Sequence, residues 1–279
     1  MHNTPHPRAS PPPVSRCVAY HRVAAAGGGE PIAVTAAAFA RQLAHLRSRY
    51  DLVPLWGPPA SPRPAGRAGL AVTFDDGWAD NFHVALPVLR EFSCPWTVFL
   101  QTGAVGSDPR FLTWPQVREM AAAGVRFGGH TQSHPHLTQL SRAAALEEIG
   151  ASRKAIEDQL GTAAEWFSYP YSDLAPWVEE LVLAAGFRYA CLTHPGRARP
   201  CGILPTVARV GIYGTTSDLM FQAKLNRAGN AVIEGARVLL DLAGGRRPAR
   251  PGRLPPRRGP DSRAPAHGTS IHGEAVGER

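Results

Sequence analysis

The chain has 279 residues, of which 44% are hydrophobic and 19% are charged, as is typical of a folded globular protein. Its longest apolar runs fall short of the roughly 18 to 20 residues that a membrane-spanning helix requires, so we expect no membrane span. The formal charge of +8 hints at nucleic-acid binding. However, residues 244–279 hold eight arginines against three acidic residues, so the rest of the chain carries only about +3.

Both ends of the chain have compositions that predict disorder. Residues 1–15 are rich in proline, and residues 244–279 are rich in Arg, Pro and Gly with few large apolar side chains. We therefore expect one folded domain over residues 16–243 and no specific nucleic-acid binding by the tail. Residues 1–15 lack the apolar segment of a secretory signal, which favours the cytoplasm. The sequence does not indicate an oligomeric state.

From about Cys17 to Gly214, short β-rich runs alternate with longer helical patterns. The predicted strands are Cys17–Tyr20, Leu52–Leu55, Leu70–Phe74, Trp96–Leu100, Val125–Gly128, Trp166–Tyr169, Tyr189–Thr193 and Val207–Ile212. A first helix, N-capped by Thr35, presents Phe39, Leu43 and Leu46 on one face. The other predicted helices are Asn81–Phe92, Pro115–Ala123, Arg142–Leu160, Pro176–Ala185, Ser217–Leu225 and Ala231–Leu242, and Pro58–Gly69 is predicted to be a loop.

This alternation predicts a parallel sheet with helices packed outside it. Seven or eight strands allow a closed or nearly closed (β/α) barrel, and a doubly wound open sheet is the competing topology. Four cysteines, Cys17, Cys94, Cys191 and Cys201, are far apart and form no CxxC pair. We expect them to be ordinary thiols and not disulfides or zinc ligands.

Unusual polar residues follow five of the predicted strands. In a (β/α) barrel the functional residues lie at the carboxyl ends of the strands, so these side chains are expected on one rim. They are His21, the pair Asp75 and Asp76, His130, Tyr171 and His194.

Two of these strand ends suggest a metal site. Asp75 and Asp76 are adjacent carboxylates that repel each other unless a cation or a base holds them. His130 and His134 are four residues apart, a spacing that presents both imidazoles to one ion on a helical turn. Separately, each pattern could be a surface turn or loop. Together they indicate a catalytic metal site with two His, one carboxylate and open positions.

The motifs in these segments resemble those of a known family. Thr73–Gly77 (TFDDG) and His130–Pro135 (HTQSHP) resemble the first two motifs of the polysaccharide deacetylases, the NodB-homology or carbohydrate esterase family 4 proteins. Trp166–Tyr171 (WFSYPY) resembles the third motif, and the likeness runs from about Tyr20 to about Leu225. The resemblance implies a deformed (β/α) barrel that hydrolyses an N-acetyl or related acyl group on a glycan.

The resemblance also implies roles for individual residues. Asp75 would be the general base. Asp76, His130 and His134 would bind a divalent metal, usually zinc, with cobalt or nickel as alternatives. The backbone N–H of Tyr171 would help to hold the oxyanion.

The third motif departs from the family pattern at its arginine. That arginine would pair with the general base, but this chain has Ser168 in its place. Arg22 and Arg209 are the two candidates that could pair with Asp75 instead.

The general acid has two candidates. His194, within Leu192–His194, fits the late Leu-x-His motif of the family. His21, within Tyr20–Val23, resembles the N-terminal strand of a subgroup that includes the poly-N-acetylglucosamine deacetylases. We favour His21, because a histidine between an apolar strand and the first helix indicates a functional role. Trp114 resembles a groove-lining tryptophan of the family, but at the start of a helix it is expected to serve in packing.

The sequence thus predicts a metal-dependent carbohydrate N-deacetylase. Its expected substrate is an N-acetylated glycan or a small amino-sugar conjugate. Two other functions stay open: a catalytically weakened, sugar-binding relative that lacks the motif arginine, and nucleic-acid binding through the basic tail.

Overall fold

The computed structural model describes residues 16–25, 30–56, 67–193 and 200–226, together with positions 14, 229, 230 and 233. All of them belong to one compact unit, Met1–Gly245. The expectations for the N-terminal arm, His194, the helix Ala231–Leu242 and the Arg-rich tail therefore lie wholly or mostly outside the described residues.

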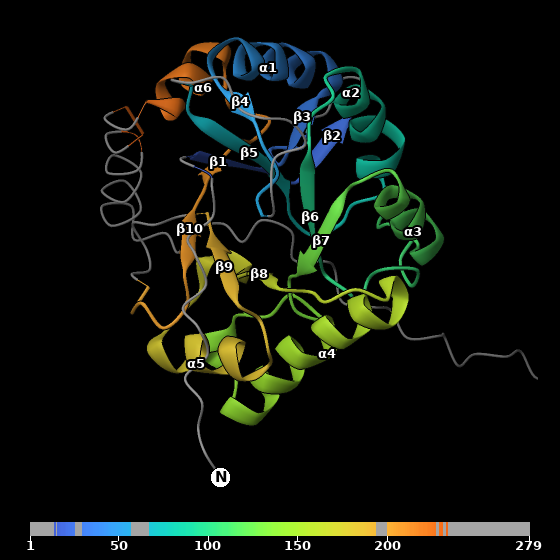
Figure 1. Cartoon of the computed structure of the whole chain (residues 1–279), viewed down its shortest axis with the longest axis vertical. Helices are drawn as coiled ribbons and strands as arrows, with labels where there is room; N and C mark the ends of the chain where they lie inside the picture. Colours follow the sequence, from blue (N-terminus) through green and yellow to red (C-terminus); the bar gives the residue numbers. More distant parts are fainter. Residues whose placement is uncertain are drawn as a thin grey trace, which may run out of the picture. The chain divides into compact units, whose positions relative to one another are not determined.

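A single parallel sheet of nine strands forms the centre of the described part of the chain (Figure 1). Its order is β10-β9-β8-β7-β6-β5-β1-β11, and β4 adds to β5 beside this path. Most of these strands are buried along their length, as expected for parallel strands with both faces covered. The strands are β1 (Arg16–Tyr20), β4 (Asp51–Leu52), β5 (Gly69–Phe74), β6 (Trp96–Leu100), β7 (Arg126–Gly129), β8 (Trp166–Ser168), β9 (Tyr189–Leu192), β10 (Thr206–Ala208) and β11 (Val210–Gly211).

The last predicted strand, Val207–Ile212, is wrong as a single element. It divides at Arg209 into β10, which pairs with β9, and β11, which pairs with β1. These two strands are the opposite ends of the sheet, and one residue joins them. The sheet is therefore nearly closed into a (β/α) barrel, which excludes the open doubly wound alternative.

Helices surround this barrel (Figure 1). They are α1 (Ala36–Arg49), α2 (Leu86–Glu91), α3 (Trp114–Ala122), α4 (Arg142–Leu160), α5 (Pro176–Ala184) and α6 (Asp218–Leu225). The predicted bounds agree to within a few residues, and Thr35 caps α1 by accepting a hydrogen bond from the Ala38 N–H. A π-helical turn, η1 (Asn81–Ala85), precedes α2, and two 3-10 turns, η2 (Leu137–Gln139) and η3 (Pro170–Ser172), follow β7 and β8.

The sequence did not predict a second, two-stranded sheet. It pairs β2 (Arg22–Ala24) with β3 (Ala33–Thr35) in parallel. Three-residue strands are too short to show a clear hydrophobic alternation. His21 is the single residue between β1 and β2, so it lies at the carboxyl end of β1.

The core explains most of the predicted apolar pattern. Phe39, Leu43 and Leu46 of α1 are fully buried, and Trp114 packs against the same core as predicted. All four cysteines are free thiols: Cys17, Cys94 and Cys191 are buried and Cys201 is exposed. Among the described residues, no helix combines the length and apolarity needed to cross a bilayer.

Candidate metal and catalytic site

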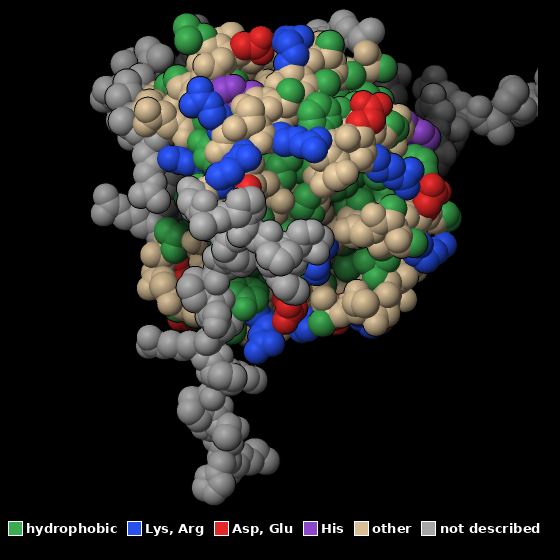
Figure 2. Space-filling view, turned by 45° about the horizontal axis from the view of Figure 1, so that its top comes forward, with side chains coloured by type: hydrophobic (Ala, Val, Ile, Leu, Met, Phe, Trp, Pro, Cys, Tyr) green, Lys and Arg blue, Asp and Glu red, His purple; other side chains and the backbone are tan. Residues whose placement is uncertain are grey.

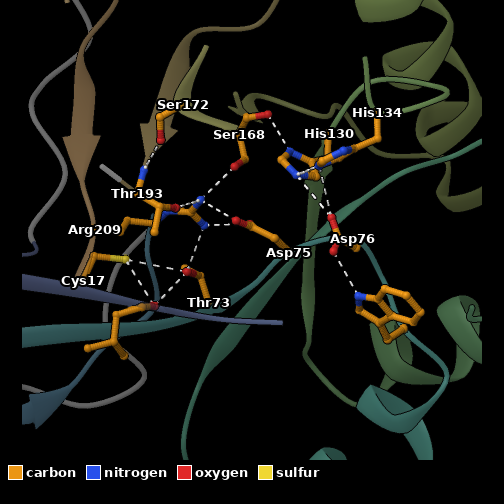
Figure 3. A network of polar contacts seen from close by, with 12 residues as sticks. Cys17, Thr73, Asp75, Asp76, His130, His134, Ser168, Ser172, Thr193 and Arg209 are labelled. Carbon is orange, nitrogen blue, oxygen red and sulfur yellow. Dashed lines mark hydrogen bonds and ion pairs between the residues drawn. The ribbon is translucent and has the colours of Figure 1, made fainter. Parts of the chain in front are cut away.

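Several of the predicted site residues meet at the carboxyl ends of the strands. Asp75 and Asp76 directly follow β5, His130 directly follows β7, and Ser168 is the last residue of β8. Figure 3 shows these side chains directed toward one another at one rim of the barrel. A cavity of about 620 Å³ beside Trp56 and Phe127 lies at the other end of the strands and includes none of them.

Asp76, His130 and His134 form a compact group of ligand atoms. Oδ1 of Asp76 lies 3.4 Å from Nε2 of His130 and 3.4 Å from Nε2 of His134. One ligand atom from each of the three residues falls within 4.8 Å of the others. Asp76 and His130 are buried and His134 is partly buried, so solvent solvates this group only weakly.

The chemistry of this group fits a divalent cation. Nδ1 of His130 lies 2.7 Å from the backbone oxygen of Ser168, so Nδ1 donates and Nε2 can offer its lone pair. Among the described residues, Oδ1 of Asp76 is buried without a hydrogen-bond donor. One carboxylate oxygen and two imidazole Nε2 atoms, the latter 3.1 Å apart, converge here, and this is the donor set of a three-ligand zinc site.

The ionisation of the group agrees with this assignment. Burial lowers the pKa of His134 to about 4, so its imidazole is neutral near pH 7, as a metal ligand must be. Burial would raise the pKa of Asp76, but the neighbouring His130 outweighs it and holds that pKa well below its ordinary value. Burial likewise opposes protonation of His130, yet Asp76 raises the pKa of His130, so metal binding there would displace a proton.

The histidine pair does not lie on a helical turn, contrary to the sequence prediction. Thr131 (φ 64°) and His134 (φ 61°) adopt left-handed backbone conformations in an irregular loop. Oγ1 of Thr131 accepts a hydrogen bond from the His134 N–H at 3.0 Å. Glu148 of α4 accepts further bonds from the backbone N–H groups of Gln132 (3.0 Å) and Ser133 (2.8 Å). These bonds offset the cost of the left-handed residues and fix the loop.

Arg209 is the arginine that pairs with Asp75. Its Nη1 and Nη2 donate to the two Asp75 carboxylate oxygens at 2.8 and 2.7 Å. Nη2 also donates to the hydroxyls of Ser168 (2.8 Å) and Thr193 (2.9 Å), and Nη1 donates to that of Thr73 (3.1 Å). Burial by itself would raise the pKa of Asp75, but Arg209 outweighs it and holds that pKa below its ordinary value.

Arg22, the other candidate, has different partners. Its guanidinium pairs with Asp80 at 2.7 Å and with Glu30, and it lies over the ring of Trp78 at 4.7 Å. Trp78 in turn donates from Nε1 to Oδ2 of Asp76 at 2.9 Å. Sequence analysis missed this contact, since a tryptophan after a turn has no special pattern.

His21 lies close to the acidic pair. The positive charge of a protonated His21 helps to lower the pKa of both Asp75 and Asp76. Its ring stacks on Tyr213 with centroids 5.8 Å apart, and its Nδ1 is buried without a hydrogen-bond partner within the described part of the chain. His194, the alternative acid, is outside the described residues, so the choice between the two histidines stays a prediction.

Tyr171 lies beside the histidine loop. Its backbone is left-handed (φ 58°, ψ 10°) within η3, where the chain turns after β8. The ring packs edge-on against His134 at 4.6 Å and stacks on His136 at 4.0 Å. The predicted oxyanion role of its N–H is compatible with this position and stays a prediction.

Known proteins are similar to this chain in sequence. Residues 63–190 match the family model described as polysaccharide deacetylase. YxkH of Bacillus subtilis is 32% identical over 130 residues, which cover 46% of this chain and 45% of that protein. Chitin deacetylase 1 of Cryptococcus neoformans is 30% identical over 115 residues, which cover 41% of this chain and 23% of that protein. The matches thus span less than half the length of either relative.

The fold is also that of solved deacetylase structures. The Streptococcus pyogenes deacetylase PplD, solved in complex with acetate, superimposes with a TM-score of 0.64 and 20% sequence identity. The superposition covers 78% of this chain and all of that one. The family match includes Asp75, Asp76, His130 and His134, which the nearly closed barrel brings together on one rim. Residues 63–190 are thus similar to the polysaccharide deacetylase family, and the chain shares the fold of a solved deacetylase.

Proposed function

We propose that the protein is a metal-dependent N-deacetylase that acts on an N-acetylated amino-sugar glycan or glycoconjugate. The observation that carries the proposal is the position of Asp75. This buried carboxylate is kept ionised by Arg209 and directly precedes Asp76 of the metal triad. A general base next to a three-ligand metal site is the arrangement that hydrolysis of an amide requires.

Asp76, His130 and His134 would hold the metal, and zinc is the favoured ion, with cobalt or nickel as alternatives. When bound, the metal would supply a Lewis acid that polarises the acyl carbonyl and acidifies water. Asp75 takes one proton from the attacking water. The N–H of Tyr171 donates to the oxygen on which negative charge develops. His21 gives a proton to the departing amine, so that acetate and a free amine are formed.

Two observations support this proposal over the other functions. Ser168, which stands in place of the motif arginine, motivated the idea of a weakened sugar-binding relative. Arg209 nevertheless pairs with Asp75, and the Ser168 hydroxyl accepts a hydrogen bond from the same guanidinium. Nucleic-acid binding through the Arg-rich tail falls on residues outside the described part of the chain, and on the described face in Figure 2 the Lys and Arg side chains lie among side chains of other kinds. Chitin deacetylase 1, a relative, supports an amino-sugar substrate.

The test is an acetate-release assay. The metal-free protein is reloaded with zinc, cobalt or nickel and incubated with N-acetylglucosamine oligomers and with small N-acetylated amino sugars. We expect acetate release from at least one substrate, and we expect Asp75→Asn protein to release far less. Metal-loaded, folded protein that releases no acetate from either class would contradict the proposal.

A further inference from the structure

We propose that Trp78 is a positioning residue that makes Asp76 a one-oxygen metal ligand. The inference rests on the proposed metal site and concerns how the chain prepares that site. It assigns a role to a side chain outside the three-residue ligand group.

The two oxygens of the Asp76 carboxylate have separate partners. Oδ2 accepts a hydrogen bond from Nε1 of Trp78 at 2.9 Å, whereas Oδ1 faces Nε2 of His130 and of His134 at 3.4 Å each. Figure 3 shows this carboxylate with one oxygen toward His130. The indole N–H occupies Oδ2 and fixes the rotation of the carboxylate, so Oδ1 alone is presented to the cation.

The indole that donates this bond is itself held in place. Its ring stacks on Phe111 with centroids 4.4 Å apart and planes 20° apart, and the guanidinium of Arg22 lies 4.7 Å over it. Phe111 is almost fully buried, and Arg22 is anchored by Asp80. Both contacts use the π surface of the indole, the surface that a stacked sugar ring would need. These contacts hold the indole in the orientation in which its N–H donates to Asp76.

The backbone fixes the same arrangement. Trp78 and Phe111 form an isolated antiparallel bridge, in which Ala79 N–H donates to the Arg110 oxygen at 2.8 Å. Gly77 has φ +80°, and a Cβ there would lie 2.6 Å from Cδ2 of Leu100. A side chain at position 77 would therefore be strained, and this turn sets the direction from Asp76 to the indole. Hydrogen bonds to a ligating carboxylate orient it and tune its affinity for the metal.

The test compares metal binding in wild-type and Trp78→Phe protein. Phenylalanine keeps an aromatic ring but removes the N–H. Metal-free proteins are titrated with Zn²⁺ against a chromophoric chelator, and with Co²⁺ while the visible absorption spectrum is recorded. We expect the Kd for Zn²⁺ to rise by roughly 10- to 100-fold, as for loss of other partners of metal ligands. The Co²⁺ spectrum should also change, because Asp76 is free to bind through both oxygens.

Trp177→Phe is the matched control. Trp177 is a partly buried indole on α5 that packs against the core, so its variant undergoes the same chemical change away from the triad. We expect wild-type metal affinity and an unchanged Co²⁺ spectrum for it. The melting temperatures of the metal-free proteins separate loss of metal affinity from loss of folding.

The outcomes distinguish this inference from the proposed function. Wild-type protein that binds metal, together with a Trp78→Phe protein of equal affinity and spectrum, overturns the role of Trp78 and leaves the site standing. Wild-type protein that binds no metal overturns both. If Trp78→Phe does not fold, benzothienylalanine at position 78 keeps the bicyclic ring and removes only the N–H. The same weakened Kd is then expected, and an unchanged Kd overturns the inference.

Discussion

Arg209 and Asp75 are 134 residues apart in the sequence but form a bidentate ion pair that is almost completely buried. Arg209 is also the single residue between β10 and β11, where the two ends of the sheet meet. Closure of the barrel therefore carries this guanidinium into the site. There it neutralises the carboxylate that we propose as the general base. The motif that this segment resembles has an arginine for that pairing, whereas this chain has Ser168.

Replacing Arg209 should change the titration of the base. In Arg209→Met, burial acts on Asp75 without the largest of its opposing charges, so the pKa of Asp75 rises above its wild-type value. The base must be deprotonated, so the acidic limb of the kcat/KM profile should move to higher pH. Leaving the carboxylate unpaired should also cost about 3 to 5 kcal/mol of unfolding free energy, measured by urea denaturation.

Arg142→Met is the control for this variant, because Arg142 forms an exposed pair with Glu180. We expect it to cost less than about 1 kcal/mol and to leave the acidic limb in place. If Arg209→Met is too unstable to assay, Arg209→Lys keeps the charge but cannot make the bidentate contact. An acidic limb that stays in place in both variants would show that Arg209 does not control Asp75.

The same pair should make the wild-type protein sensitive to acid. The pKa of Asp75 is lower in the folded state than its unfolded value of about 3.9. Its stabilising contribution is therefore present above the unfolded pKa and is lost as the pH falls through the folded pKa. Urea unfolding between about pH 5 and pH 2 should show this loss, and Arg209→Lys should show less of it. Equal acid sensitivity in the two proteins would assign the loss to other carboxylates.

The metal content should depend on the triad. We expect about one divalent metal per wild-type chain, since Asp76, His130 and His134 supply one set of three ligands. Elemental analysis of the protein with all three changed to alanine should show loss of the metal. Full retention would place the metal elsewhere in the chain.

Asp75→Asn should separate catalysis from metal binding. The amide keeps the shape of the side chain but cannot accept the proton of water, so activity should fall by a factor on the order of a hundred or more. Metal content should stay at the wild-type level, because Asp75 is outside the ligand group. Near wild-type turnover would mean that another group activates the water.

The general acid can be assigned by two alanine variants. If His21 is the acid, His21→Ala should lower kcat strongly while metal content stays unchanged. The basic limb of its pH–rate profile should flatten, since the group that must be protonated has been removed. His194→Ala should then cost little. The reverse order would assign the acid to His194 and leave His21 a structural role against Tyr213.

Local pattern was sufficient for the parts of this protein that depend on neighbours in sequence. The apolar runs predicted β5 and β6. Helix α4 begins after its N-cap Ser141 and ends before Gly161, close to the predicted residues. The sequence also predicted the three residues that the structure brings together as a candidate metal group. Asp76, His130 and His134 belong to short motifs. Asp76 and His130 also follow strands that a short apolar run is enough to predict.

Tertiary structure decided what depends on distant contacts. The left-handed backbone of the histidine loop is stabilised by Glu148 from α4, which a four-residue spacing does not indicate. The orientation of Asp76 depends on Trp78, whose ring is held by Phe111. The choice of Arg209 over Arg22 depends on which strand ends meet when the barrel closes. A buried carboxylate needs a cationic partner, and an arginine at any of these strand ends could supply it, so the closed fold determines which arginine pairs with Asp75.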